Sequence, residues 1–442
     1  MTARSGTGYR PAVAGHATTD GAGIGIAGAT SIGIGGMVGG GIFAVLGVAA
    51  TDAGGATPAA FLVGGTVAAL TAYSYTRLSV AMPSAGGTVA FIDRVFGVGR
   101  LTGSVNALLW IGYVVTTALY AAAFGNYAGT FFSGDGAVDP LLLRVLIGVG
   151  VALPWLVNLT GAALVARTET FIVGVKVVIL VVVVVAGVPS VSASRLAPDT
   201  WGGPVEILAA GLLVFVAYEG FELISNASED VRNGARTLPW AFGLSVGIVI
   251  VLYVAIAAVV VGSLSPERIV EASDFALAEA ASTSLGTVGF KAVAVSAVLA
   301  TLSALNATLY GAARLSYTLA TEGELPERFE TVRWNDPVGL HITAVLGLVA
   351  AITLPLESIS AMASAIFLLV FAAVNTAAWR VGSDARVQRP IAAAGALTCS
   401  LALAILIVDT ARSSPTALVT LVVTALILLG IEDRLLSPRR QT

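Results

Sequence analysis

Apolar residues along this chain gather in long blocks that short polar segments separate. About twelve blocks are long enough to cross the ~30 Å hydrocarbon core of a bilayer as helices. The blocks run without the strict alternation of membrane barrel strands, so they predict an all-α integral membrane protein. They lie at 26–51, 57–82, 101–132, 141–160, 167–188, 205–226, 238–263, 287–320, 338–356, 358–381, 390–409 and 414–431.

The basic residues between these spans predict which loops face the cytoplasm. With a cytoplasmic N-terminus, the inner segments hold 17 Lys and Arg residues and the outer segments hold 5, while Lys176 lies inside a span. Positive charge collects on the cytoplasmic side of membrane proteins, so both termini are expected there. The chain is therefore divided into a tail at 1–25, a single transmembrane domain at 26–432 and a tail at 433–442, and it is expected in the cytoplasmic membrane.

Composition excludes several other kinds of chemistry. The chain is 57% hydrophobic and only 11% charged, and its net charge of -3 suggests no nucleic-acid partner. A single cysteine, Cys399, and two histidines, His16 and His341, argue against a metal site. No cofactor is expected, and without a Cys/His cluster or an exposed Ser–His pair the chain is not expected to be an enzyme.

The first span contains an unusual run of glycines. Residues 31–43 read SIGIGGMVGGGIF, and three consecutive glycines cost about 1 kcal/mol each relative to alanine in a helix interior. A break here would expose free N–H groups that suit a carboxylate, and carbonyls that suit an ammonium group. The alternative is close helix packing through two Gly-x-x-x-Gly pairs.

The sixth span contains two acidic residues and a glycine. It reads FVAYEGFE over residues 215–222, and acidic residues inside a membrane usually mark a pathway. This interrupted segment comes five spans after the first one, with four spans between them. We therefore expect a 5+5 inverted repeat, made of spans 1–5 and 6–10 with helices 1 and 6 broken, and two appended helices.

Lys176 lies well inside the fifth span, about nine residues beyond Arg167. Its long side chain could extend back to the inner interface. It could instead be a buried amine that gains and loses a proton, which an arginine in its place would not do.

Five motifs, in order, resemble the amino acid–polyamine–organocation (APC) superfamily of permeases, and the resemblance covers nearly the whole chain. Two departures lie in inner loops: Gly234 stands where the family usually has proline, and Val89 where an aromatic residue is common. The motifs are GGGIF at 39–43, MPSAGG at 82–87 with FG at 96–97, the span 6 segment 215–222, EDVRN at 229–233 with LP at 238–239, and the span 8 exit at 314–326 with Pro337.

The resemblance implies a role for each candidate residue. The N–H groups of Gly39, Gly40 and Gly41 would bind the carboxylate of an amino acid, and Tyr218 would shape or gate the pocket. Carbonyls of Met37, Phe215 and Ala217 would accept from its ammonium group. Lys176 resembles a span 5 lysine of proton-coupled members, so protons rather than sodium are expected. Glu219 is a second candidate proton site, unless it only bonds to neighbouring backbone.

The residues leave several functions open. A symporter for neutral amino acids fits the small residues around the breaks, whereas a charged Glu219 in the pocket would fit an amine or polyamine. An exchanger and a non-transporting solute sensor are alternatives on the same fold. The charged segment 322–333 is most simply a solvated loop, and Arg314 could pair with an acid to close the inner side.

Overall fold

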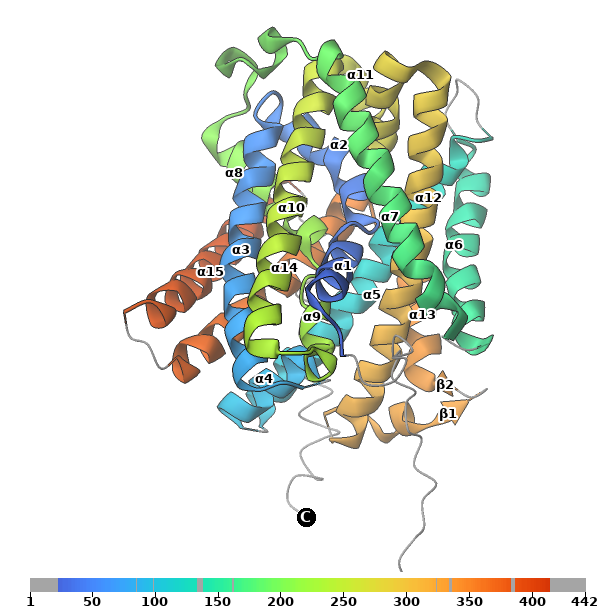
Figure 1. Cartoon of the computed structure of the whole chain (residues 1–442). Coiled ribbons are helices and arrows are strands. Elements are labelled where there is room, and N and C mark those ends of the chain that lie inside the picture. Colours follow the sequence, from blue (N-terminus) through green and yellow to red (C-terminus); the bar gives the residue numbers. More distant parts are fainter. Residues whose placement is uncertain are drawn as a thin grey trace, which may run out of the picture.

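The computed structural model describes residues 23–84, 86–97, 99–132, 138–160, 163–322, 324–333, 336–382 and 386–413. Most of the predicted tail at 1–25, the twelfth span at 414–431 and the tail at 433–442 lie outside the described residues. The described chain folds into a bundle of helices (Figure 1).

The first span is two helices rather than one. Helix α1 (Ile26–Met37) and helix α2 (Gly41–Ala53) meet at an angle of 49°. The predicted break in span 1 is therefore present. Four long helices follow: α3 (Thr57–Ala81), α5 (Arg100–Gly129), α6 (Pro140–Thr160) and α7 (Ala163–Gly187).

The sixth span is interrupted as well. Helix α8 (Pro204–Leu213) passes into the 3₁₀ helix η4 (Val214–Tyr218), and the short helix α9 (Leu223–Asn226) follows. The order of one broken span and four further helices thus occurs twice, as the repeat predicts. The later helices are α10 (Gly234–Ser263), α12 (Ala276–Thr321), α13 (Val338–Thr353), α14 (Leu356–Val381) and α15 (Gln388–Ser413).

Length and apolarity identify a smaller set of membrane-crossing helices than the sequence predicts. Within the described residues eight helices pass that test, or nine when α1 and α2 count as one span. Helix α13 is only 16 residues long, and polar residues such as Thr71, Ser74 and Thr76 interrupt the apolar sequence of α3. A total of twelve spans remains a prediction, since the last one lies outside the described part of the chain.

Helix α12 includes more than the predicted eighth span. It is 46 residues long, and Gly286 interrupts it with a φ of 58°. The part after Gly286 corresponds to the predicted span at 287–320, whereas the part before it belongs to the predicted outer loop.

Several short elements fill segments that were expected to be loops. They are α4 (Gly87–Phe96), α11 (Pro266–Glu271), the 3₁₀ helices η1 (Val188–Ser190), η2 (Ala193–Leu196), η3 (Pro198–Thr200), η5 (Ser228–Asp230), η6 (Ser273–Phe275) and η7 (Glu327–Glu330), and the antiparallel strands β1 (Val332–Arg333) and β2 (Asp336–Pro337). Helices α4 and α11 lie at opposite ends of the bundle (Figure 1), as the alternating topology requires.

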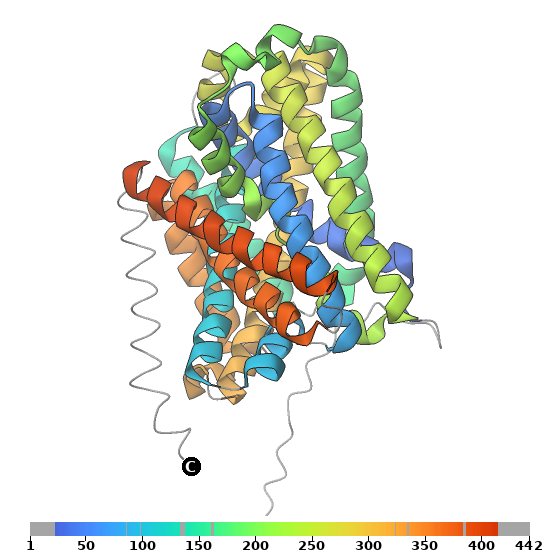
Figure 2. The same ribbon diagram turned by 90° about the vertical axis from the view of Figure 1, so that its left-hand side faces the viewer.

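The core is built around α5 and the broken spans. In the most apolar stretch of α5, 94% of the residues are buried, against 22% in α6. Helix α15 lies across the outside of α14 and α3 (Figure 2). The breaks are therefore enclosed by other helices, and α6 and α15 face outward.

Candidate functional site

The first break leaves three peptide N–H groups available. Helix α1 ends when Val38 adopts a φ of -79° and a ψ of 52°, and α2 begins at Gly41. Among the described residues, no hydrogen bond uses the N–H groups of Gly39, Gly40 or Gly41. These groups lie at the start of α2, where a helix favours negative charge. The local geometry suits a carboxylate.

Neighbouring helices approach the three glycines closely. A Cβ on Gly39 would lie 3.0 Å from the Cβ of Ala304, and one on Gly40 would lie 2.5 Å from Cδ1 of Tyr120. A Cβ on Gly41 would lie 2.8 Å from Cα of Ala217. Side chains are therefore excluded by α5, α12 and span 6, which keeps the backbone bare.

Two other glycines of span 1, Gly35 and Gly36, allow close packing against neighbouring segments. A Cβ on Gly36 would lie 2.5 Å from the carbonyl oxygen of Gly220, and one on Gly35 would lie 2.9 Å from Cγ2 of Val173. Gly35 and Gly36 thus allow close contact with α7 and with the second break. The glycines of span 1 serve helix packing as well as a break.

The second break depends on an unusual backbone at Gly220. Glu219 is extended, with a ψ of 147°, and Gly220 has a φ of 117°, which L side chains rarely adopt. The hydroxyl of Ser364 on α14 partly replaces the lost helical bonds. It accepts from the N–H of Val216 at 3.2 Å and donates to the carbonyl of Leu213 at 2.8 Å.

Hydrogen bonds from tyrosine hydroxyls involve two of the predicted binding residues, Met37 and Tyr218. The Tyr253 hydroxyl of α10 donates to the carbonyl of Met37 at 2.7 Å, so one lone pair of this predicted acceptor is already used. The Tyr218 hydroxyl donates to the carbonyl of Phe61 at 2.8 Å. Tyr218 therefore points toward α3 and fastens span 6 to it, while Phe215 and Ala217 are buried beside it.

Both acidic residues of span 6 are buried at the break. One carboxylate oxygen of Glu219 accepts from the Thr116 hydroxyl at 3.3 Å. Thr116 and Tyr120 are one turn apart on α5, and Tyr120 contacts the first break, so Glu219 lies close to both breaks. Glu222 instead accepts from the N–H of Gly220 at 2.8 Å. At this break Glu222 thus makes a hydrogen bond to the neighbouring backbone.

Lys176 lies on the side of α7 that faces the core of the helix bundle. Its side chain is 1% exposed, and Val173, Leu180 and Val183 share the same buried face. Val173, one turn earlier, contacts Gly35 of α1. Lys176 therefore sits near the level of the first break, and its side chain does not extend to the surface of the protein.

Backbone bridges join the two broken spans at both ends. Ile24, just before α1, donates to the carbonyl of Asp230 at 2.8 Å and accepts from the N–H of Arg232 at 3.0 Å. At the other end, a bridge pairs Gly54 with Trp201. Spans 1 and 6 are thus linked as one unit within the bundle.

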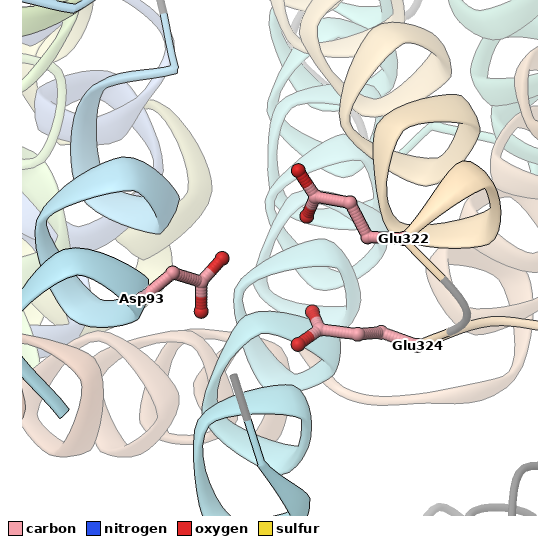
Figure 3. Close-up of side chains that lie close together, drawn as sticks. All are labelled: Asp93, Glu322 and Glu324. Atoms are coloured by element: carbon pink, nitrogen blue, oxygen red, sulfur yellow. The ribbon is translucent and has the colours of Figure 1, made fainter. Parts of the chain in front are cut away.

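Three carboxylates form a separate cluster at the end of the bundle that carries α4. The oxygens of Asp93, Glu322 and Glu324 lie within 4.8 Å of one another (Figure 3). The amide nitrogen of Asn106 donates to Asp93 and to Glu324, at 3.0 Å each. Burial raises the pKa of Asp93, and burial together with the charge of Asp93 raises the pKa of Glu322.

The sequence does not predict this acidic cluster, because it places Glu322 in a charged segment typical of a solvated loop. Asp93 and Glu322 are more than two hundred residues apart in the sequence, so only the fold brings them together. Carboxylates of this kind can ligate a hard cation, but exposed acidic groups often stand together without one. The cluster lies apart from the two breaks.

The remaining candidates have ordinary surroundings. His341 accepts from the Trp155 indole N–H at 3.0 Å, and Cys399 is buried; His16 lies outside the described residues. Arg314 donates to the Tyr310 hydroxyl at 3.1 Å and lies over its ring. Within the described residues Arg314 pairs with no acid, so the lock that it could form is not present in this conformation.

Comparisons with known proteins place the chain in one protein family. Residues 24–431 match the family model described as amino acid permease. The chain is 34% identical to the inner membrane transport protein YbaT of Escherichia coli, over 86% of this chain and 88% of that protein. It is 27% identical to the methylthioribose transporter of Bacillus subtilis, over 73% of this chain and 72% of that protein. It is 26% identical to the branched-chain amino acid permease BcaP of the same organism, over 79% of this chain and 78% of that protein.

Proposed function

Because the chain belongs to the amino acid permease family, we propose that it is a proton-coupled, sodium-independent secondary transporter of amino acids that works by alternating access. The resemblance to the APC superfamily is confirmed by this membership, and the chain is a multi-pass membrane transporter. The substrate, the coupling ion and the site residues are our proposals.

The observation that carries the proposal is the set of free N–H groups at the first break. A substrate carboxylate would accept from Gly39, Gly40 and Gly41 at the start of α2. Its ammonium group would donate to carbonyls among Met37, Phe215 and Ala217. Both halves of a zwitterion then find partners without a charged side chain, which favours a neutral amino acid.

Coupling to protons is proposed to depend on Lys176. The amine lies beyond the reach of solvent in this conformation. An ammonium group buried in this way is costly unless it is compensated, so the protonated state should depend on what occupies the site. Alternating access would expose the amine to one side at a time, and the proton would move with the substrate.

A second candidate substrate is a cationic amine, because Glu219 lies beside both breaks. If its carboxylate faces the substrate when the site opens, it would pair with an added positive charge. A neutral substrate needs no such partner. The two proposals therefore differ in what Glu219 does.

Uptake into proteoliposomes tests the proposed function. We expect accumulation of at least one neutral amino acid when the outside is made acidic, with no requirement for sodium. A tenfold proton gradient corresponds to about 1.4 kcal/mol per proton, enough for roughly tenfold accumulation with one proton. Transport without any effect of the gradient would exclude symport, and binding without transport would favour a sensor.

Replacing Glu219 with glutamine separates the two substrate classes. For a neutral amino acid we expect KM to change less than about threefold, since the amide can still accept from Thr116. For a cationic amine, losing the carboxylate should raise KM at least about tenfold, the worth of a charged hydrogen bond. Asp139→Asn, a change at an exposed acid before α6, is the matched control. Competition between labelled alanine and putrescine for uptake measures the change in KM for the two substrate classes.

A further inference from the structure

An apolar groove runs along the outside of the bundle between α7 and α10. It encloses about 510 Å³. A second hollow of about 420 Å³ shares Gly243 and Leu244 with it and continues to Trp240, toward the start of α10. The residues that line the groove include Val177, Val181 and Val184 of α7, and Gly243, Gly247 and Val251 of α10.

Two glycines make the groove, and they do not serve helix packing. A Cβ on Gly243 or Gly247 would meet no atom within 4 Å. The neighbouring side chains of Ile248 and Val251 are 43% and 70% exposed. On the surface of a membrane-spanning helix these side chains meet hydrocarbon rather than water. The material that fills the groove must therefore be apolar.

The end of the groove near the start of α10 is basic. Arg236 lies in the first turn of α10, four residues before Trp240, so both side chains share one face of the helix. Trp240 is 57% exposed, which is typical of a residue at the membrane interface. Arg232 lies just before the helix. Both arginines are exposed.

Neither arginine is neutralised by an acid in the part of the chain that the structure describes. Glu229 and Asp230 are close in sequence, but no described ion pair joins either of them to Arg232 or Arg236. A cation in the first turn is also opposed by the helix dipole. An anion at this point would interact favourably with the arginines and with the N–H groups at the start of α10.

The groove is long enough to hold one acyl chain of a membrane lipid. From Pro239 to Ala255 the helix rises ~24 Å at 1.5 Å per residue, while one leaflet contributes ~15 Å of hydrocarbon. The groove thus begins at the interface and passes the middle of the membrane. We propose that it binds one acyl chain of an anionic phospholipid, whose phosphate lies at Arg236 and Arg232.

Native mass spectrometry of the purified full chain tests this proposal. We expect one bound phosphatidylglycerol, preferred at least fivefold over phosphatidylcholine with the same acyl chains. Arg236→Gln should reduce the affinity for phosphatidylglycerol roughly fivefold, the worth of one basic residue near an anionic surface. Gly247→Leu should reduce binding of both lipids, because its side chain fills the groove.

Matched variants on α6 provide the controls. A Cβ on Gly148 would also meet no atom within 4 Å, and Arg144 is an exposed arginine away from the groove. Gly148→Leu and Arg144→Gln should bind phosphatidylglycerol as the parent does. Phosphatidylglycerol binding by Gly247→Leu equal to that of Gly148→Leu would overturn the groove as the binding site. Equal binding of the two lipids by the parent would overturn the role of the arginines.

A fluorescence measurement tests the same proposal without filling the groove. Phosphatidylglycerol with brominated acyl chains should quench Trp240, because this residue lines the hollow that leads into the groove. The quenched fraction of total emission should fall in Trp240→Phe. If quenching is the same in the parent and in Trp240→Phe, no lipid chain lies at that end of the groove and the proposal fails.

Discussion

Proton-driven accumulation should be lost when Lys176 is replaced by glutamine or alanine. The side chain is 1% exposed and faces the core of the helix bundle at the level of the first break. A neutral replacement removes the only basic group that we place at the coupling site. Accumulation in an imposed proton gradient should fall at least about tenfold, to equilibration, whereas exchange of internal for external substrate should continue.

Two further variants sharpen this prediction. Lys176→Arg should also lose coupling, because a guanidinium group keeps its charge at every accessible pH. Lys291→Gln changes the only other lysine of the chain, which is exposed on α12, and should transport normally. Unchanged proton-driven accumulation in Lys176→Gln would remove Lys176 from the coupling mechanism.

A methyl group at Gly40 should impair transport nearly as severely. The Cβ of alanine would lie 2.5 Å from Cδ1 of Tyr120 and 3.0 Å from Cγ2 of Thr301. The backbone at the start of α2 would have to move, and its N–H groups would no longer meet the carboxylate together. We expect KM to rise at least about tenfold, which corresponds to the loss of one charge-assisted hydrogen bond.

Gly148→Ala is the control for this change. Its Cβ meets no atom within 4 Å, so the same substitution adds no clash there and KM should stay the same. Equal levels of purified, monodisperse protein would show that Gly40→Ala still folds. A Gly40→Ala variant that keeps the parent KM would mean that the substrate carboxylate binds elsewhere.

Both breaks, and most of the spans within the described residues, could be predicted because local sequence determines them. Long apolar blocks leave a helix as the only backbone structure that lipid tolerates. Three glycines in span 1, and Gly220 between two acids in span 6, mark the places where that helix fails. These signals are contained within a few consecutive residues, so a single sequence carries them.

Other features arise only from contacts between distant segments. The bond from Tyr253 to the carbonyl of Met37 joins residues 216 positions apart, and Ser364 bonds to Leu213 across 151 positions. The acidic cluster of Asp93, Glu322 and Glu324 likewise depends on contacts between distant segments. The sequence does not reveal helix α4 for another reason: its 10 residues are too few to stand out from a polar loop by hydropathy.

Polar partners also changed the interpretation of single residues. The sequence does not predict that the Tyr218 hydroxyl bonds to the carbonyl of Phe61 on α3, and its role at the pocket stays a prediction. A tyrosine in an apolar span does not reveal which helix its hydroxyl will meet. The direction of such a side chain depends on the neighbours that tertiary packing supplies.

The most direct test of the account is a structure of the full chain in lipid with its transported amino acid bound. We expect the substrate carboxylate within hydrogen-bonding distance of the backbone nitrogens of Gly39, Gly40 and Gly41, and its ammonium group facing carbonyls of the sixth span. A substrate bound away from both breaks, or held chiefly by charged side chains, would contradict it.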